Sequence, residues 1–303
     1  MTEHEFTLAD RIAKIQSINS QYDLERNAYI SFSGGKDSTV LHYLIDEALP
    51  GNNIPRVFIN TGLEYKLILQ FVREMAAKDN RFVIINAGKN IKETLEKEGY
   101  PFKSKEHSHK LESYKNGSRS PSIMRYFNKT EDSFNPCPSS LLYQIDSSFT
   151  LKISDRCCYN FKKKPASDYS KKSGRNITIT GMMKEEGGQR TTLNCIVTDK
   201  DGSVKKFHPL AVVSKSFEDW FISHKSIQLC LQRCAVWTTN ITSTIETVWR
   251  IVKRAQLNTL GILLPSERKR AEWLWAPIYA EYRRIGYRLD KANNQPSLFE
   301  EFN

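Results

Sequence analysis

Long hydrophobic runs are missing from this sequence of 303 residues. No apolar stretch approaches the roughly 20 residues that a membrane-spanning helix requires. The segment Met1–Asp10 is polar and acidic and lacks the apolar core of a secretory signal peptide. Internal repeats are also absent, which excludes repeat architectures. We therefore expect a globular protein with no membrane association and a cytoplasmic location.

Cysteine is scarce, and none follows Cys234. A cytosolic protein keeps its thiols reduced, and neighbouring cysteines such as Cys157 and Cys158 are poor disulfide partners because their side chains diverge. Metal binding, catalysis and plain burial therefore remain open for these thiols. The six cysteines are Cys137, Cys157, Cys158, Cys195, Cys230 and Cys234.

Acidic residues are outnumbered: 45 lysines and arginines face 34 aspartates and glutamates, which gives a net charge of +11. A basic protein attracts polyanions such as nucleotides, nucleic acid or sulfated substrates. A solvated basic surface would give the same composition, so charge alone does not decide between a nucleic-acid partner and none.

Short apolar runs alternate with segments of helical periodicity. The runs at Ala28–Phe32, Arg56–Asn60, Phe82–Asn86 and Ile177–Thr180 predict strands, and residues 39–48 and 65–78 predict helices between the first three. This alternation predicts a doubly wound, mostly parallel α/β sheet. Asp201-Gly202 between two further β-rich runs predicts a hairpin. Residues 103–168 predict long loops and short helices, and helical patterns dominate after Ser216.

The segment Ser33-Gly34-Gly35-Lys36-Asp37-Ser38 lies between the first predicted strand and the helix that follows. Two glycines let the backbone approach an anion, and the backbone N–H groups at a helix N-terminus favour negative charge. Lys36 adds a positive charge. Phosphate would repel Asp37 unless Asp37 holds Mg²⁺ or caps the helix. The spacing differs from the G-x-x-x-x-G-K-[ST] loop, so ordinary phosphate-transferring NTPases are not indicated.

This loop resembles the PP-loop of the adenine-nucleotide α-hydrolase superfamily, and Asn60-Thr61-Gly62-Leu63-Glu64-Tyr65 resembles a segment of its phosphoadenosine-phosphosulfate (PAPS) reductase-like family. Weaker similarities follow in the same order along the chain, from Gly99-Tyr100-Pro101 to Phe207-His208-Pro209-Leu210. The resemblance implies an adenine nucleotide bound at the carboxyl ends of parallel strands. It also divides the chain into a PP-loop domain (1–222), a helical C-terminal region (223–290) and a tail (291–303).

The resemblance implies the site residues one by one. Ser33, Gly34, Gly35, Lys36, Asp37 and Ser38 would contact phosphate, with Lys36 and Asp37 catalytic. Gly62 and Glu64 would line the nucleotide site, and so would Gly181, Glu185 and Arg190 from a later family segment. That segment departs from the family at two positions, where Met183 replaces an arginine and Gly187 replaces a serine. Loss of the arginine removes a bidentate anion clamp, which disfavours PAPS itself.

Cys157, Cys158, Cys230 and Cys234 resemble, in their order, the cluster ligands of iron–sulfur members of this family. Four thiolates could hold one [4Fe–4S] cluster, although the family's spacing of the second pair is not kept. Buried structural cysteines remain the alternative. The stretch 231–255 falls where the family's second cysteine pair should lie and is divergent, with Trp237, Trp249 and several threonines.

The tail holds Gln295-Pro296-Ser297-Leu298-Phe299, which resembles the peptide by which bacterial proteins dock on the DNA sliding clamp. Gln295 would be its polar contact, and Leu298 and Phe299 its apolar anchors. The alternative is that these two side chains fold back onto the protein.

The sequence thus predicts a PAPS reductase-like PP-loop enzyme. It would bind ATP or a related adenine nucleotide with Mg²⁺ and act on the α-phosphate side, in sulfur transfer or nucleic-acid modification. Two alternatives remain open. One is a sulfonucleotide reductase, which the lack of a late cysteine nucleophile disfavours. The other is a nucleotide-binding adaptor that is recruited to DNA through the sliding clamp.

Overall fold

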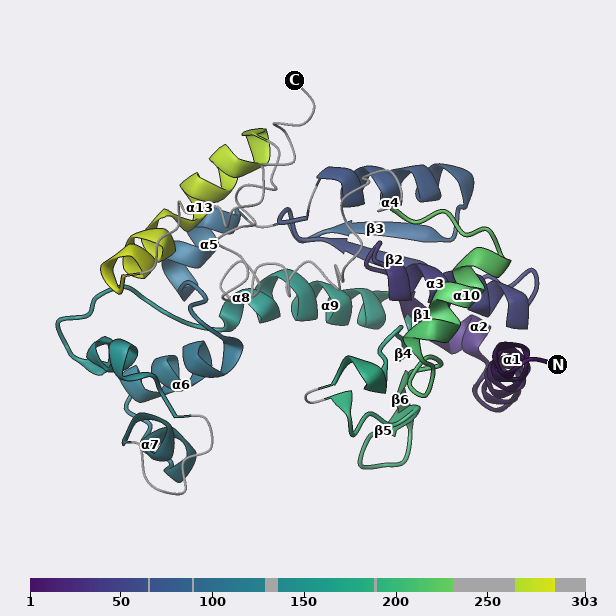
Figure 1. Ribbon diagram of the computed structural model, residues 1–303, viewed down its shortest axis with the longest axis horizontal. Coiled ribbons are helices and arrows are strands. Elements are labelled where there is room, and N and C mark those ends of the chain that lie inside the picture. Colours follow the sequence, from purple (N-terminus) through teal and green to yellow (C-terminus); the bar gives the residue numbers. More distant parts are fainter. Residues whose placement is uncertain (65, 89, 129–135, 188–189, 231–264, 287–303) are drawn as a thin grey trace. The chain divides into compact units, whose positions relative to one another are not determined.

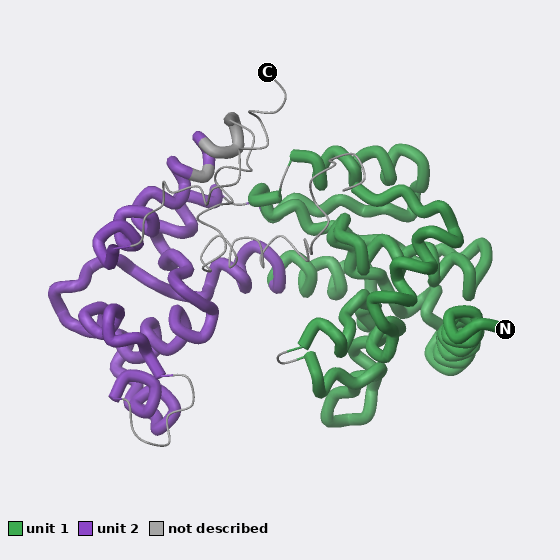
Figure 2. Tube along the Cα trace, in the orientation of Figure 1, with its two compact units in different colours: residues 1–87, 164–244 green, residues 88–163, 245–303 purple. Residues whose placement is uncertain are grey.

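A computed structural model describes residues 1–303 except 65, 89, 129–135, 188–189, 231–264 and 287–303 (Figure 1). The chain divides into two compact units (Figure 2). Unit 1 comprises residues 1–87 and 164–244, and unit 2 comprises residues 88–163 and 245–303. Of the helices in the described ranges, none is both long and apolar enough to span a bilayer. The boundaries expected near residues 222 and 290 stay a prediction.

Unit 1 is built on a six-stranded sheet with the order β3-β2-β1-β4-β6-β5. Its pairs are parallel except for the antiparallel hairpin of β5 and β6. The predicted fold class is therefore confirmed, and so is the hairpin around Asp201-Gly202. The strands are β1 (Ala28–Ser31), β2 (Arg56–Asn60), β3 (Phe82–Asn86), β4 (Ile177–Ile179), β5 (Ile196–Thr198) and β6 (Val204–Phe207).

Helices cover both faces of this sheet. Ala28 and Ile30 of β1 belong to an apolar core shared with α1, α3 and α10. Tyr29 points to the opposite face, because side chains alternate along a strand, and its ring lies 5.3 Å from that of Tyr169 in α9. The helices of unit 1 are α1 (Glu3–Tyr22), α2 (Leu24–Asn27), α3 (Lys36–Ala48), α4 (Lys66–Lys78), α9 (Lys164–Ser173) and α10 (Lys215–His224).

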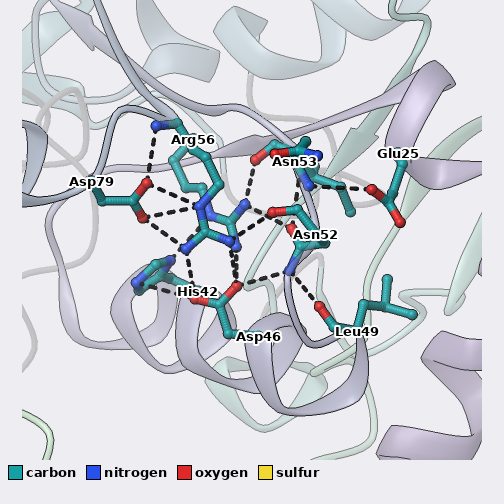
Figure 3. A network of polar contacts seen from close by, with 10 residues as sticks. Glu25, His42, Asp46, Leu49, Asn52, Asn53, Arg56 and Asp79 are labelled. Atoms are coloured by element: carbon teal, nitrogen blue, oxygen red, sulfur yellow. Dashed lines mark hydrogen bonds and ion pairs between the residues drawn. The ribbon is translucent and has the colours of Figure 1, made fainter.

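Buried polar side chains fix α3 against the sheet (Figure 3). Arg56, the first residue of β2, is fully buried, and its guanidinium lies 2.5 Å from Asp46 Oδ1 of α3. The same guanidinium donates to His42 Nδ1 (3.1 Å). Arg81, just before β3, donates to both Asp46 oxygens (2.7 and 2.9 Å). These bonds join the second half of α3 to β2 and β3, so its first turn is held in a fixed place.

Unit 2 is helical over its described residues. The segment 103–168, predicted as loops and short helices, includes an eleven-residue helix, α6. Tyr282 of α13 stacks on Phe102 with ring centroids 4.5 Å apart, and Lys103 N–H donates to the Tyr282 hydroxyl. The α-helices are α5 (Ile91–Glu98), α6 (Lys105–Lys115), α7 (Pro121–Asn128), α8 (Arg156–Cys158) and α13 (Pro265–Arg284).

Candidate nucleotide site

The strand order places a topological switch point between β1 and β4. From β1 the chain proceeds to β2 and β3 on one side, whereas β4, β6 and β5 lie on the other. Ligands of open α/β sheets bind at such a point, outside the carboxyl ends of the strands. The loop Ser33–Ser38 follows β1, and Gly181 follows β4. The candidate phosphate-binding loop therefore lies where the topology favours a ligand.

Hydrogen bonds within the loop hold it closed at the start of α3. Ser33 N–H donates to Ser38 Oγ (3.2 Å), Ser38 Oγ donates to Gly35 O (3.0 Å), and Gly35 N–H donates to Ser33 Oγ (3.3 Å). Gly34 has φ +75°, and a Cβ there would lie 3.0 Å from Ile68 Cγ2. Both the backbone angle and the space require glycine at this position.

The helix after the loop begins earlier than the sequence indicates. Its N-cap is Gly35, and Lys36 is its first residue, three residues before the predicted start at Thr39. The alternative in which Asp37 caps the helix is therefore wrong. Asp37 lies in the first turn, beside the backbone N–H groups that a helix N-terminus presents to an anion. The Mg²⁺ contact predicted for Asp37 stays a prediction.

Gly181 brings the end of β4 against the same turn. A Cβ at Gly181 would lie 2.8 Å from the carbonyl oxygen of Asp37 and 2.9 Å from its carbonyl carbon. Both atoms belong to the backbone, so neither can rotate away as a side chain would. Gly181 thus packs closely against the first turn of α3, and the nucleotide contact predicted for it stays a prediction.

We expect Gly181→Ala to displace that turn and lower the free energy of unfolding by about 1–3 kcal/mol, the usual cost of overpacking. Nucleotide affinity should fall with it. Gly174→Ala is the control, since Gly174 has φ +72° but open space around it. The control should lose stability and keep its affinity, as measured by thermal melts and calorimetric titration. Normal affinity in Gly181→Ala would show that the contact does not shape the site.

Lys36 is held by two carboxylates that the sequence analysis did not single out. Its ammonium lies 3.1 Å from Glu218 Oε2 and 3.2 Å from Asp219 Oδ1, both on α10. The Glu218 side chain is 1% exposed, whereas that of Asp219 is 69% exposed. A separation of 183 residues between Lys36 and Asp219 explains why no local pattern indicates the pair.

The charges of this cluster shift its titration. Burial, followed by the nearby charge of Asp37, raises the pKa of Glu218 to about 7, although Lys36 acts in the opposite direction. Burial alone would lower the pKa of Lys36, but Glu218 and Asp219 outweigh it and the net shift is upward. Lys36 is therefore charged at neutral pH, and the buried carboxylate is ionised above that range.

Gly62 and Glu64 organise the turn that follows β2. The Glu64 carboxylate accepts hydrogen bonds from Thr61 N–H (3.1 Å), Thr61 Oγ1 (2.8 Å) and Gly62 N–H (2.9 Å). Gly62 has φ +79°. Both residues therefore stabilise the conformation of this turn. The role predicted for both residues, lining the nucleotide site, stays a prediction.

The residues predicted from the later family segment, Glu185 and Arg190, contact other groups of the protein. Glu185 Oε2 accepts a hydrogen bond from Lys215 N–H at the start of α10 (2.5 Å), and Arg190 pairs with Glu186. Met183, at the family's arginine position, is 1% exposed and belongs to the apolar core of unit 1. An anion clamp is therefore absent at position 183. The nucleotide contacts predicted for Glu185 and Arg190 stay predictions.

The cysteines proposed as cluster ligands fall in different parts of the chain. Cys157 and Cys158 are in unit 2, Cys230 is in unit 1, and Cys234 lies outside the described residues. Burial raises the pKa of Cys157 to about 12, and Cys230 packs in an apolar cluster. Over the described ranges, no three His, Cys, Asp or Glu side chains form a group suited to a metal ion. The [4Fe–4S] cluster stays a hypothesis.

Two further predictions concern segments outside the described residues. They are the clamp-binding peptide with Gln295, Leu298 and Phe299, and the divergent stretch 231–255. Both stay predictions.

The chain is a doubly wound α/β protein, with a glycine-rich loop at the switch point of its sheet and a lysine at the helix N-terminus that follows. Within this class, residues 27–134 match the family model of the phosphoadenosine phosphosulfate reductase domain. This match confirms, over these residues, the resemblance found in the sequence.

Two proteins of Methanocaldococcus jannaschii, both described as uncharacterized, are similar in sequence. One is 38% identical over 103 residues, 31% of this chain and 25% of the relative. The other is 35% identical over 83 residues, 27% of this chain and 17% of the relative. The chain thus spans a quarter or less of the length of these curated relatives.

Three solved structures are similar at low sequence identity. A PAPS reductase from Candida auris, in a phosphate complex, has a TM-score of 0.43 at 17% identity, covering 74% of this chain and 86% of its own. An NH₃-dependent NAD synthetase from Campylobacter jejuni has 0.41 at 14% identity, covering 97% and 100%. A U34-tRNA thiolase from Methanococcus maripaludis, with a [4Fe–4S] cluster, has 0.39 at 13% identity, covering 97% and 84%.

Proposed function

We propose that this protein binds ATP with Mg²⁺ and uses the linkage between the α- and β-phosphates. The α-phosphate side would pass to an acceptor as an adenylate, and pyrophosphate would leave. A sulfur donor or another nucleophile would then displace AMP. The observation that supports this most is the placement of Lys36, a residue of the loop, at the first position of α3 and at the switch point of the sheet.

The chain's own groups suit the phosphate end of the nucleotide. The loop and the helix N-terminus would bind the pyrophosphate, and the Lys36 ammonium would stabilise the negative charge that develops on the leaving group. Magnesium would come with the nucleotide and neutralise charge on the phosphates. Mg²⁺ is commonly held by one or two carboxylates together with substrate phosphates and water. A single carboxylate, Asp37 in the first turn of α3, fits this pattern without a closed cage of protein ligands.

ATP is favoured over a sulfonucleotide because of position 183. An arginine would offer a planar pair of donors to a second anionic group, whereas Met183 is buried among apolar side chains. A reductase acting on PAPS is therefore the weaker alternative. The acceptor is proposed to be anionic or nucleic acid in nature, since the chain's net charge of +11 favours such partners.

The test is Lys36→Ala. We expect it to weaken binding of Mg·ATP by about 1.5–3 kcal/mol, or about 10- to 150-fold, the value of a charge-assisted contact. Isothermal titration calorimetry gives the affinities, and a pyrophosphate-release assay reports the reaction. Lys225→Ala is the matched control, because Lys225, the C-cap residue of α10, also pairs with a glutamate, Glu47, which is not a residue of the loop. Equal affinities of wild type and Lys36→Ala would refute the assignment of the loop.

A further inference from the structure

Glu218 stands out among the charged residues of unit 1. The residue is fully buried, and neither carboxylate oxygen has a hydrogen-bond donor of good geometry within the described residues. The Lys36 ammonium, 3.1 Å from Oε2, is the cation that faces it. A carboxylate removed from water in this way is costly unless a positive charge stays close. Glu218 therefore ties the lysine of the phosphate loop to α10.

The charges around the loop do not suit a bare anion. Lys36 contributes one positive charge, while Asp37, Glu218 and Asp219 carry one negative charge each when ionised. These four side chains therefore sum to a negative charge beside a loop whose backbone favours phosphate. A polyphosphate that arrived without a cation would meet repulsion from the buried carboxylate, which solvent screens poorly. One that arrived with a divalent cation would bring the missing positive charge.

We infer that Glu218 is a specificity-determining residue that makes the loop select a metal-bound nucleotide over metal-free anions. The inference rests on the proposed function, since it concerns the phosphate end of the same site. Glu218 would act through Lys36, whose charge it partly neutralises, and through its own field at the phosphates. It would not itself touch the metal or the nucleotide.

Asp219 provides an internal comparison. It contacts the same ammonium at a similar distance, but its side chain is 69% exposed. Ion pairs at exposed positions are weakened by solvent and salt. If the selection arises from the buried charge, neutralising Asp219 should matter far less than neutralising Glu218.

The experiment measures dissociation constants by calorimetry at pH 8.5, where Glu218 is ionised. The ligands are ATP with excess Mg²⁺, ATP with EDTA, and inorganic pyrophosphate with EDTA. The variants are wild type, Glu218→Gln and Asp219→Asn. Glu218→Leu serves if the glutamine variant folds poorly, because it also removes the buried charge.

We expect Glu218→Gln to bind metal-free ATP and pyrophosphate at least about tenfold more tightly than wild type, the size of one poorly screened charge at several ångströms. Affinity for Mg·ATP should change less, so the dissociation constant for metal-free ATP divided by that for Mg·ATP should fall. Asp219→Asn should change that ratio by less than about threefold. In a Lys36→Ala background, Glu218→Gln should still improve binding of metal-free anions, because part of the effect is direct repulsion.

Two results would overturn the inference. One is that Glu218→Gln leaves the ratio of the dissociation constants for metal-free ATP and Mg·ATP unchanged. The other is that the variant changes the dissociation constants of all ligands equally, which would indicate a structural role alone. If wild type binds no Mg·ATP, the proposed function fails, but the pyrophosphate measurement still shows whether Glu218 repels metal-free anions. Failure of the two proposals is therefore distinguishable.

Discussion

Asp46→Ala should lower the free energy of unfolding by about 3–5 kcal/mol, the cost of leaving a buried charge without its partner. The reason is Arg56, which is fully buried and lies 2.5 Å from Asp46 Oδ1. Arg81 would keep its ion pair with Asp79 (2.8 Å), so Arg56 is the residue whose charge would be left without a carboxylate partner. Urea denaturation followed by circular dichroism measures the change.

The control for this prediction uses the same substitution at an exposed ion pair. Asp168 pairs with Lys164 one helical turn away, with side chains 57% and 45% exposed. Asp168→Ala should cost less than about 1 kcal/mol. The double variant Asp46→Leu, Arg56→Met should be more stable than Asp46→Ala, because it removes both charges. A loss below about 1 kcal/mol for Asp46→Ala would contradict the proposed importance of this pair.

Acid should destabilise the protein as the pH falls below about 6.5, the ordinary pKa of histidine. Burial is the first cause that lowers the pKa of His42, His107 and His208 to about 4 in the folded state. In the unfolded chain these imidazoles titrate near their ordinary pKa of about 6.5. The unfolded state therefore binds more protons between those values. The stability that the neutral imidazoles contribute is fully present above about pH 6.5 and is lost as the pH falls toward 4.

The upper limit of this effect is about 3 kcal/mol per histidine, for a shift of roughly 2.5 pKa units. Glu218 acts in the opposite sense, since its raised pKa favours the folded state as the pH falls from about 7. One carboxylate offsets part of the contribution of three histidines. We therefore expect a net loss of several kcal/mol between pH 6.5 and 4, by the same linkage.

Thermal melts at several pH values between 7.5 and 4.5 test this expectation. His107→Gln should remove part of the slope, because His107 is fully buried between Tyr126 and Gln144. His109→Gln should keep the slope, since the His109 side chain is 64% exposed. A melting temperature that stays constant from pH 6.5 to 4.5 would contradict the assignment of neutral buried imidazoles.

The sequence predicted those parts of the fold that depend on local pattern. Apolar runs bounded by turn residues placed β2 and β3 at their observed limits. The two glycines and the lysine marked the loop as the candidate phosphate site, because backbone geometry at a strand–helix junction is readable from such local residues. The start of α3 was missed, since Gly35 caps the helix without a side chain, where the usual cap residues would have indicated it.

The partners of Lys36 could not be predicted from the sequence. Glu218 and Asp219 reach the loop only because α10 packs against α3, and packing at such a separation follows from tertiary contacts, not from periodicity. Arg56 is a similar case, because an arginine that opens a strand is ordinarily expected at the surface. Its burial depends on Asp46, His42 and Asn52, which come from two other segments.

Unit 2 is assembled from two separated segments of the chain, and this sets the order of events during biosynthesis. Phe102 and Lys103 both contact Tyr282, which is synthesised 179 residues after Lys103. At roughly 5–20 residues per second, the ribosome needs about 10–40 s to supply that partner. At the start of this interval only β1, β2 and β3 of the unit 1 sheet are synthesised, and β4, β5 and β6 follow during it. Phe102 stays without the ring of Tyr282 until the end of the interval. The nascent chain would then depend on chaperones most strongly in its middle third.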